Sequence, residues 1–245
     1  MTANRRVAIV TGASRGIGQV IAMRPAADGF AVVVNFASSS VSADETVAVI
    51  HGKGGQAVAI RGDISDPDQV ARLYAGAKEA FGRVDVVVNN AGIMTLAPIA
   101  DGKLDDFDRT IAINLRATFL MMSRAAEYLR DGGRFIALST SVLGKNFPGY
   151  GAYIASKAGV EGLVRVFANE LRGRNITVNA IAPGPIATGL FLNGKSEELI
   201  RQIASQSPME RLGQPVDIAN SVAFLAGPDG AWVNGQIIRV NGGFA

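Results

Sequence analysis

The chain has 245 residues and a formal net charge of +3, with 48% apolar and 18% charged residues. This composition predicts a globular protein with a substantial core, and the small, scattered positive charge does not indicate a nucleic-acid partner. The absence of cysteine excludes disulfides, thiolate metal ligands and a thiol nucleophile, and we expect no metal site. No apolar run approaches the ~18 residues of a membrane span. The apolar run after Arg5 and Arg6 is too short for a signal peptide, so we expect a cytoplasmic protein without a membrane partner.

The chain begins with a predicted strand, Val7–Val10, a glycine-rich turn over residues 11–18, and a helix from Ile17 to about Ala27. Glycines let the backbone approach a pyrophosphate, and the N–H groups of the first helical turn point at the anion. The spacing is Gly-x3-Gly-x-Gly, and its place after the first strand favours a phosphate cradle over an ordinary turn. Pro25 removes a hydrogen bond and clashes with the preceding turn, so we expect a kink or an early end of the helix there.

The second predicted strand, over residues 30–35, bears on the choice of dinucleotide. An acid after this strand would bind the adenosine ribose hydroxyls, whereas a basic or small polar set accepts a 2′-phosphate. Small residues and serines follow the strand here, the first acid is Asp44, and Arg15 of the glycine turn could reach the same region. The sequence therefore predicts NADP(H), with NAD(H) as the alternative and a solvated loop arginine as the alternative role of Arg15.

Strands and helices continue to alternate, which predicts an α/β protein with a doubly wound parallel sheet of about seven strands and helices on both faces. We see no repeat or long linker and expect one domain over residues 1–245. The further strands are predicted at residues 56–61, 83–89, 134–139, 175–182 and 236–240, and the further helices at 41–52, 66–82, 105–129, from Tyr153 to about 172, and 215–226.

Polar residues cluster where these strands end. Asp63 follows the third strand and either accepts a hydrogen bond from an adenine amino group or serves as a turn residue. Asn114 lies inside a predicted helix, where an asparagine is unfavourable and requires a hydrogen-bonding reason. Three hydroxyls, on Ser139, Thr140 and Ser141, end the fifth strand.

Tyr153 and Lys157 are four residues apart on a predicted helix, so their side chains lie on one face. A phenol loses its proton near pH ~10. A fixed ammonium nearby stabilises the phenolate and lowers that pKa, so the pair could exchange a proton with an alcohol or carbonyl oxygen near neutral pH. Alternatively the two are ordinary helical neighbours, and the rest of the chain must decide.

Taken together and in order, these features resemble the short-chain dehydrogenase/reductase family, over almost the whole chain from Val7 to Gly243. The resemblance implies a Rossmann-like single domain that binds a dinucleotide and catalyses hydride transfer at a carbonyl carbon. It also implies that Tyr153 is the general acid or base and that Lys157 lowers the tyrosine pKa and holds the nicotinamide ribose. Asn114 would position a water near Lys157, and Ser141 would orient the substrate oxygen. Ser141 is preferred to Ser139 because the run Ser-Val-Leu-Gly at residues 141–144 resembles a family motif.

The resemblance and the loop positions give two further sets of expected site residues. The cofactor is expected at Gly12, Ser14, Arg15, Gly16, Ile17, Gly18, Asn35, Ser38, Asp63, Ile64, Asn90, Ala91, Gly92, Tyr153, Lys157, Pro183, Gly184, Ile186 and Thr188. The substrate is expected at Met94, Ser141, Leu143, Phe147, Tyr150, Pro185, Leu190 and Phe191.

The predicted activity is NADPH-dependent reduction of a ketone or aldehyde, because the chain is similar to 3-oxoacyl-[acyl-carrier-protein] reductases and NADPH carbonyl reductases. The substrate is then a 3-oxoacyl thioester or a small apolar ketone. An alcohol, polyol or steroid dehydrogenase working oxidatively is the alternative, and a non-catalytic dinucleotide-binding regulator or an epimerase fits less well. An acyl carrier protein is a candidate partner through Arg130 and Arg174, and the family resemblance implies a homotetramer.

Overall fold

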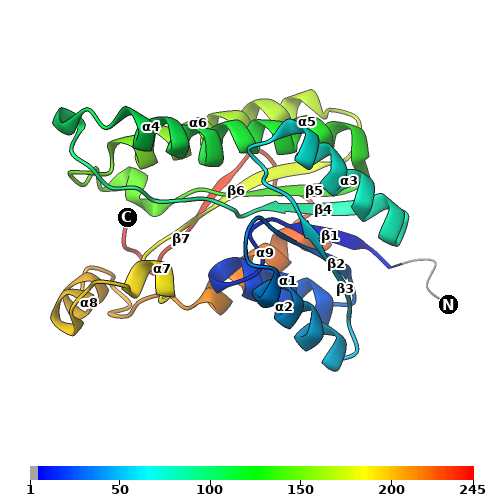
Figure 1. Cartoon of the computed structure of the whole chain (residues 1–245), viewed down its shortest axis with the longest axis horizontal. Coiled ribbons are helices and arrows are strands. Elements are labelled where there is room, and N and C mark those ends of the chain that lie inside the picture. Colours follow the sequence, from blue (N-terminus) through cyan, green and yellow to red (C-terminus); the bar gives the residue numbers. More distant parts are fainter. Residues whose placement is uncertain (1–4) are drawn as a thin grey trace.

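A seven-stranded parallel sheet forms the centre of the molecule (Figure 1). The computed structural model describes residues 5–245, except for the side chain of Leu190. The spatial order is β3-β2-β1-β4-β5-β6-β7, so the chain starts in the middle, fills one side and then crosses back to fill the other. The strands are β1 (Val7–Val10), β2 (Ala31–Phe36), β3 (Gln56–Arg61), β4 (Val84–Asn89), β5 (Leu129–Leu138), β6 (Thr177–Pro183) and β7 (Ile237–Val240).

Helices cover both faces of this sheet, as the alternating pattern predicts. In Figure 1, α1, α2 and α9 lie on one side of the sheet, and α3, α4, α5 and α6 lie on the other. The two short helices α7 and α8 lie beyond the carboxyl ends of the strands. The helices are α1 (Gly16–Ala27), α2 (Ser40–Gly52), α3 (Pro67–Phe81), α4 (Leu104–Ile111), α5 (Ala117–Tyr128), α6 (Gly151–Glu170), α7 (Gly189–Leu192), α8 (Glu197–Ala204) and α9 (Pro215–Ala226), with short turns η1 (Ile99–Asp101), η2 (Ala112–Arg116) and η3 (Ser141–Gly144).

The core consists of two apolar clusters, one on each face of the sheet. Val10 and Val86 pack in the cluster under α1 and α9, whereas Ile9 and Val87 pack in the cluster under α3, α5 and α6. This division follows from the strand geometry, in which successive side chains point to opposite faces. Because both faces are covered, β1 and residues 86–88 of β4 are apolar on both faces rather than alternating.

Pro25 does not end the first helix early, so this part of the expectation is wrong. Helix α1 continues to Ala27, and Pro25 lies in its last turn as a buried residue. The position explains the tolerance, because only two helical residues follow Pro25 and a distortion there disturbs little of the helix. The Pro25 carbonyl still accepts a hydrogen bond from Phe30 N at 3.0 Å, which links the helix to the start of β2.

The helix expected over residues 105–129 is divided in the structure. It consists of α4, a π-helical turn (η2) and α5, and it ends at Tyr128. Strand β5 then begins at Leu129, earlier than expected, with a shift in its register against β4 between Val84 and Val86. The π-helical turn holds Asn114, the residue that the sequence marks as misplaced in an α-helix.

Candidate active site

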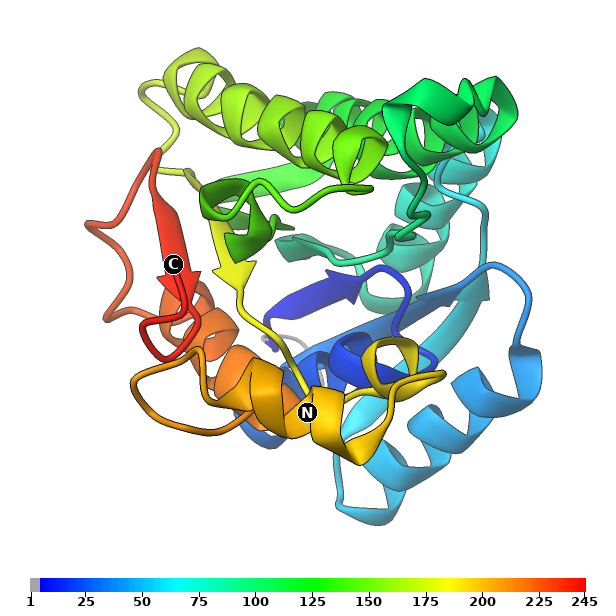
Figure 2. The same cartoon turned by 90° about the vertical axis from the view of Figure 1, so that its left-hand side faces the viewer.

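The loops after β1, β4, β5 and β6 meet at the edge of the sheet where the strands end. Figure 2 shows this side of the molecule, with α7 and α8 (yellow to orange) in the foreground. Strands β1 and β4 are neighbours here, although β2 and β3 lie between them in the sequence. Open α/β sheets bind their ligands at such a switch point, outside the carboxyl ends of the strands.

The turn after β1 has a shape that only glycine allows. Gly12 and Gly16 have φ values of +60° and +58°, in the left-handed region. A Cβ on Gly18 would lie 2.3 Å from the Gly12 carbonyl oxygen, so any side chain there would push the turn apart. Helix α1 begins at Gly16, and the preceding Arg15 is exposed and makes no side-chain capping bond. The first N–H groups of α1 are therefore suited to an anionic ligand such as a phosphate.

Hydrogen bonds hold the turn after β1 against the loop after β4. The Thr11 hydroxyl accepts from the N–H groups of Asn90 and Ala91, both at 3.0 Å, and donates to Asn89 Oδ1 at 3.3 Å. Asn90 Nδ2 donates in return to the carbonyls of Thr11 (2.9 Å) and Gly12 (3.2 Å). The side chain of Asn90 thus fixes the glycine turn against the loop after β4.

Asn114 has the hydrogen bonds that its position in a helix requires. Its side chain is buried, accepts from Ile93 N at 2.8 Å and donates to Ile93 O at 2.9 Å and to Ser156 Oγ at 3.1 Å. The Thr118 hydroxyl donates to the Asn114 carbonyl at 2.7 Å, which satisfies an oxygen in the widened turn. Asn114 therefore joins the loop after β4 to helix α6.

Lys157 lies in the same buried region. Its side chain is 5% exposed and its Nζ donates to the Leu138 carbonyl at 2.6 Å. Burial of the ammonium lowers the pKa of Lys157 to about 8. A Cβ on Gly92 would lie 3.5 Å from Lys157 Nζ and 3.1 Å from Asn114 Oδ1. Because Gly92 has no side chain, it does not cover Lys157 Nζ or Asn114 Oδ1 on the side of the carboxyl edge, the end of the sheet where the strands have their carboxyl ends.

The pKa of Tyr153 differs from the sequence-based expectation. Tyr153 is half-buried, and the surrounding protein raises the pKa of its phenol, while a hydrogen bond with Thr140 acts in the opposite direction. Tyr150 adds a smaller upward effect on this pKa. The expected lowering by Lys157 is not present, because burial dominates and the ammonium donates to the Leu138 carbonyl instead. Tyr153 is therefore held in its protonated form at neutral pH.

The structure also changes which hydroxyl lies beside Tyr153. The expected Ser141 is buried, donates to the Ala182 carbonyl at 2.8 Å and accepts from Asn241 Nδ2 at 3.0 Å. Thr140, one residue earlier, provides the hydroxyl that bonds to Tyr153. The geometry therefore does not support Ser141 as the substrate-orienting residue.

The third hydroxyl at the end of β5 has a partner on α6. Ser139 Oγ donates to Glu161 Oε1 at 2.7 Å. The three neighbouring hydroxyls thus have three different environments, which the sequence motif alone does not distinguish. The sequence signal for Thr140 is its hydroxyl at the strand end, whereas the family motif points to a serine.

An aromatic chain extends from Tyr153 to the last residues of the sequence. The ring centroids of Tyr153 and Tyr150 are 6.3 Å apart, those of Tyr150 and Phe147 5.9 Å, and those of Phe147 and Phe244 6.4 Å. Lys145 Nζ lies 4.8 Å from the centroid of the Phe244 ring. Phe244 was not among the expected site residues, because its distance along the chain from Tyr153 hides this contact.

The expected cofactor residues differ in how they are placed. Asn35 is buried and its Nδ2 donates to the carbonyls of Ile60 (3.3 Å) and Gly62 (3.0 Å), so its side chain joins β2 to β3 and is not available to a ligand. Asp63 is exposed and accepts from Ser65 N and Oγ, as a turn residue does. Of the other expected residues, Ser14 and Ile17 lie in the glycine turn and at the start of α1, and Pro183, Gly184, Ile186 and Thr188 lie at and after the end of β6. Ser38 is exposed after β2, and Ile64 is buried in the core after β3.

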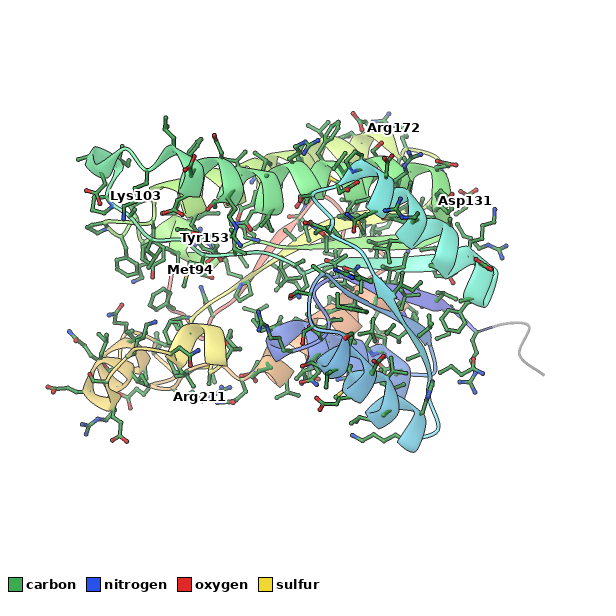
Figure 3. The ribbon with its side chains drawn as sticks, viewed as in Figure 1. Met94, Lys103, Asp131, Tyr153, Arg172 and Arg211 are labelled. Atoms are coloured by element: carbon green, nitrogen blue, oxygen red, sulfur yellow. The ribbon has the colours of Figure 1, made fainter. Side chains whose placement is uncertain are left out.

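The expected substrate residues lie on the loops around Tyr153. Phe147 and Tyr150 belong to the aromatic chain, and Figure 3 shows Met94 and Tyr153 at the same end of the molecule. Pro185 lines a cavity of about 240 Å³ below the loop after β6. Leu143 and Phe191 are half-buried, and the side chain of Leu190 lies outside the described residues.

Arg174 does not lie near this site within the chain. Its guanidinium donates to the carbonyls of Ala126 and Leu129 and pairs with Asp131 at 2.9 Å, where β5 begins. Figure 3 shows Asp131 at the end of the molecule opposite Tyr153. The placement of Arg174 beside the active-site entrance is therefore wrong for a single chain.

Comparison with known proteins agrees with this geometry. A family model described as enoyl-(acyl carrier protein) reductase matches residues 12–245. A chloroplastic NADPH-dependent aldehyde reductase-like protein of Arabidopsis thaliana is 44% identical, with 98% of this chain and 94% of the relative covered. A short-chain type dehydrogenase/reductase of Picea abies is 45% identical (97% and 92% covered), and a versicolorin reductase of Emericella nidulans is 40% identical (97% and 95%).

A solved structure has the same fold over its whole length. A blue fluorescent protein from a metagenomic library, determined with NADPH, is 39% identical and superposes with a TM-score of 0.93, covering 100% of both chains. The chain therefore belongs to the short-chain dehydrogenase/reductase family. The predicted fold class and family are confirmed, and the protein is an oxidoreductase that acts on a carbonyl or alcohol group.

Proposed function

We propose that the protein reduces a ketone or aldehyde to an alcohol with NADPH, and that Tyr153 donates the proton. The observation that carries this proposal is the convergence of Tyr153, Thr140 and Lys157 at the carboxyl edge beside the glycine turn. The names of the Arabidopsis and Emericella relatives describe reductases, and the Arabidopsis name includes NADPH. The NADPH in the metagenomic structure gives the same support to the predicted cofactor.

The residues present fit a dinucleotide. The turn at Gly12, Gly16 and Gly18 has no side chains to fill the cradle, and the N–H groups at the start of α1 face it. Gly92 leaves Lys157 Nζ open for the hydroxyls of a ribose. When bound, the reduced nicotinamide supplies the hydride, and the protein supplies orientation and the proton.

Tyr153 is protonated at neutral pH, which is the state that proton donation to a carbonyl substrate requires. Tyr153 can donate its proton from Oη to an alkoxide oxygen as that oxygen forms. The Thr140 hydroxyl donates to the phenolate that remains, and Lys157 lies in the same buried region with a pKa of about 8.

Replacing Tyr153 by phenylalanine tests this function, because the ring is kept and only the proton is removed. We expect kcat for carbonyl reduction to fall by at least about a hundredfold, with NADPH binding and the thermal midpoint little changed. A folded Tyr153→Phe enzyme with near-normal turnover would contradict the mechanism. Because the residues around Tyr153 are mainly apolar, we expect the best substrates in a ketone and aldehyde screen to be apolar.

We further propose that residues 1–245 act as one dinucleotide-binding and catalytic domain, in the cytoplasm and as a homotetramer. One sheet joins all seven strands, and within residues 5–245 no helix is long and apolar enough to cross a membrane. The name of the Arabidopsis relative makes a plastid location the competing assignment. Exposed apolar side chains on α4, α5 and α6 support the tetramer, whereas Arg174 is engaged within the chain and gives an acyl carrier protein no support.

A further inference from the structure

Arg61 is an exposed cation beside the loop that follows β2. It is the last residue of β3 and pairs with Phe36, the last residue of β2. Its Nε donates to the Ala37 carbonyl at 3.1 Å, which holds the guanidinium against the loop. None of the ion pairs within residues 5–245 includes Arg61, so its charge is not neutralised by a carboxylate of the chain.

The loop itself is built to accept an anion. Residues 37–40 are alanine and serines, and the first acid after β2, Asp44, lies on α2. The glycine turn adjoins the loop, because Ala13 N donates to the Asn35 carbonyl at 2.9 Å. Arg15 is exposed on that turn. The nearest acid to Arg61 in sequence, Asp63, accepts hydrogen bonds from Ser65.

We propose that Arg61 binds the 2′-phosphate of NADPH together with Arg15 and so helps to set the preference for NADPH over NADH. This inference rests on the proposed function, since it concerns the dinucleotide of the same site. The two cations belong to different elements that both adjoin the loop, Arg15 to the glycine turn and Arg61 to β3. Guanidinium groups suit this role because they keep their charge and bind phosphate oxygens in a forked geometry.

Binding of nucleotide fragments tests the proposal without turnover. The probes are 2′,5′-ADP and 5′-AMP, which differ in the 2′-phosphate, and calorimetry gives their dissociation constants. For Arg61→Ala we expect 2′,5′-ADP to bind about tenfold more weakly, with 5′-AMP within about twofold of its original value. The ratio of kcat/KM for NADPH to that for NADH should fall by the same factor.

Two further variants separate charge from structure. Arg61→Gln keeps a donor for the Ala37 carbonyl and removes the charge, so it should lose 2′,5′-ADP affinity as Arg61→Ala does. Lys53→Ala removes an exposed cation at the opposite end of the 13-residue helix α2, about 20 Å from the loop. That distance exceeds the Debye length of ~8 Å at physiological salt, so neither fragment should change in affinity.

Each outcome bears on a different claim. Equal weakening of both fragments in Arg61→Ala, or full 2′,5′-ADP affinity in Arg61→Gln, would overturn the assignment of Arg61. If Arg15→Ala removed all discrimination while Arg61→Ala removed none, Arg15 alone would carry the preference and the assignment would also fail. A wild-type protein that binds both fragments equally and uses NADPH and NADH equally would instead refute the cofactor preference of the proposed function.

Discussion

Thr140 and Ser141 are neighbouring hydroxyls with opposite surroundings. The Thr140 hydroxyl bonds to Tyr153, whereas the Ser141 hydroxyl is held between the Ala182 carbonyl and the Asn241 amide. The chain leaves β5 at this point and enters η3, so adjacent side chains turn to different partners. Catalysis should therefore depend on the threonine, and the serine should matter for stability.

We predict that Thr140→Ala lowers kcat about tenfold to a hundredfold, because it removes a donor to the developing phenolate. Thr140→Ser keeps the hydroxyl and should retain most of the activity. Ser141→Ala should leave kcat within about threefold and lower the free energy of unfolding by about 1 kcal/mol. Steady-state kinetics with NADPH and urea denaturation measure both quantities. Loss of turnover in Ser141→Ala but not in Thr140→Ala would restore the assignment made from the motif.

Lys157 destabilises the fold that holds it. Its pKa is about 8 in the folded protein against an ordinary lysine pKa of 10.5, so from pH 8 to 10.5 the unfolded chain binds a proton that the folded chain does not. Stability therefore rises with pH across this window, and the full cost, at most about 3 kcal/mol, is present below pH 8.

Replacing Lys157 by methionine should remove this cost and abolish reduction. After allowance for the bond to the Leu138 carbonyl, we expect the free energy of unfolding at pH 7 to rise by about 1–2 kcal/mol. The gain should shrink towards pH 10.5, as measured by denaturation of the cofactor-free protein at several pH values. A difference between the two proteins that does not vary with pH would show that the buried charge is not the cause.

At the scale of elements, the π-helical turn shows how a site interrupts regular structure. The turn places Asn114 where its amide pairs with both backbone groups of Ile93 and with Ser156 on α6. We predict that Asn114→Ala lowers the free energy of unfolding by about 2 kcal/mol, since it leaves the part-buried N–H and carbonyl of Ile93 without this partner. It should also lower kcat, because Gly92 and Lys157 adjoin the same amide. If Asn114→Ala lost activity but kept its free energy of unfolding, Asn114 would act in the reaction and would not stabilise the fold.

The sequence predicts those elements whose signals are local, and it misses features that depend on contacts with distant segments of the chain. Apolar runs bounded by glycine locate the strands, and Asp66 and Gly82 mark the ends of α3, where the structure has an N-cap and a left-handed C-cap. The π-helical turn depends on partners from distant segments, so periodicity alone extends one helix through it. The same holds for Asn35 and Phe244, whose contacts lie on other strands and loops.

At the scale of the whole molecule, apolar side chains gather on the outer helices of one face. Leu104 and Phe107 on α4, Phe119 on α5 and Val166 on α6 are between 43% and 85% exposed, as is Ile99 before α4. Such a surface on covering helices is typical of an interface between subunits. A closed assembly through these helices would bury it and would leave the carboxyl edge, with Tyr153, free to bind substrate.

We predict that the protein has four times its 25.5 kDa chain mass in light scattering at micromolar concentration. Phe119→Glu places a charge on the exposed face of α5, and burying an unpaired charge at an interface costs several kcal/mol, so this variant should dissociate to smaller species. Val41→Glu is the matched control, because Val41 is also exposed but lies on α2, on the other face of the sheet. It should keep the wild-type mass. A monomeric wild-type protein would refute the tetramer, and an unchanged mass in Phe119→Glu would move the interface away from α5.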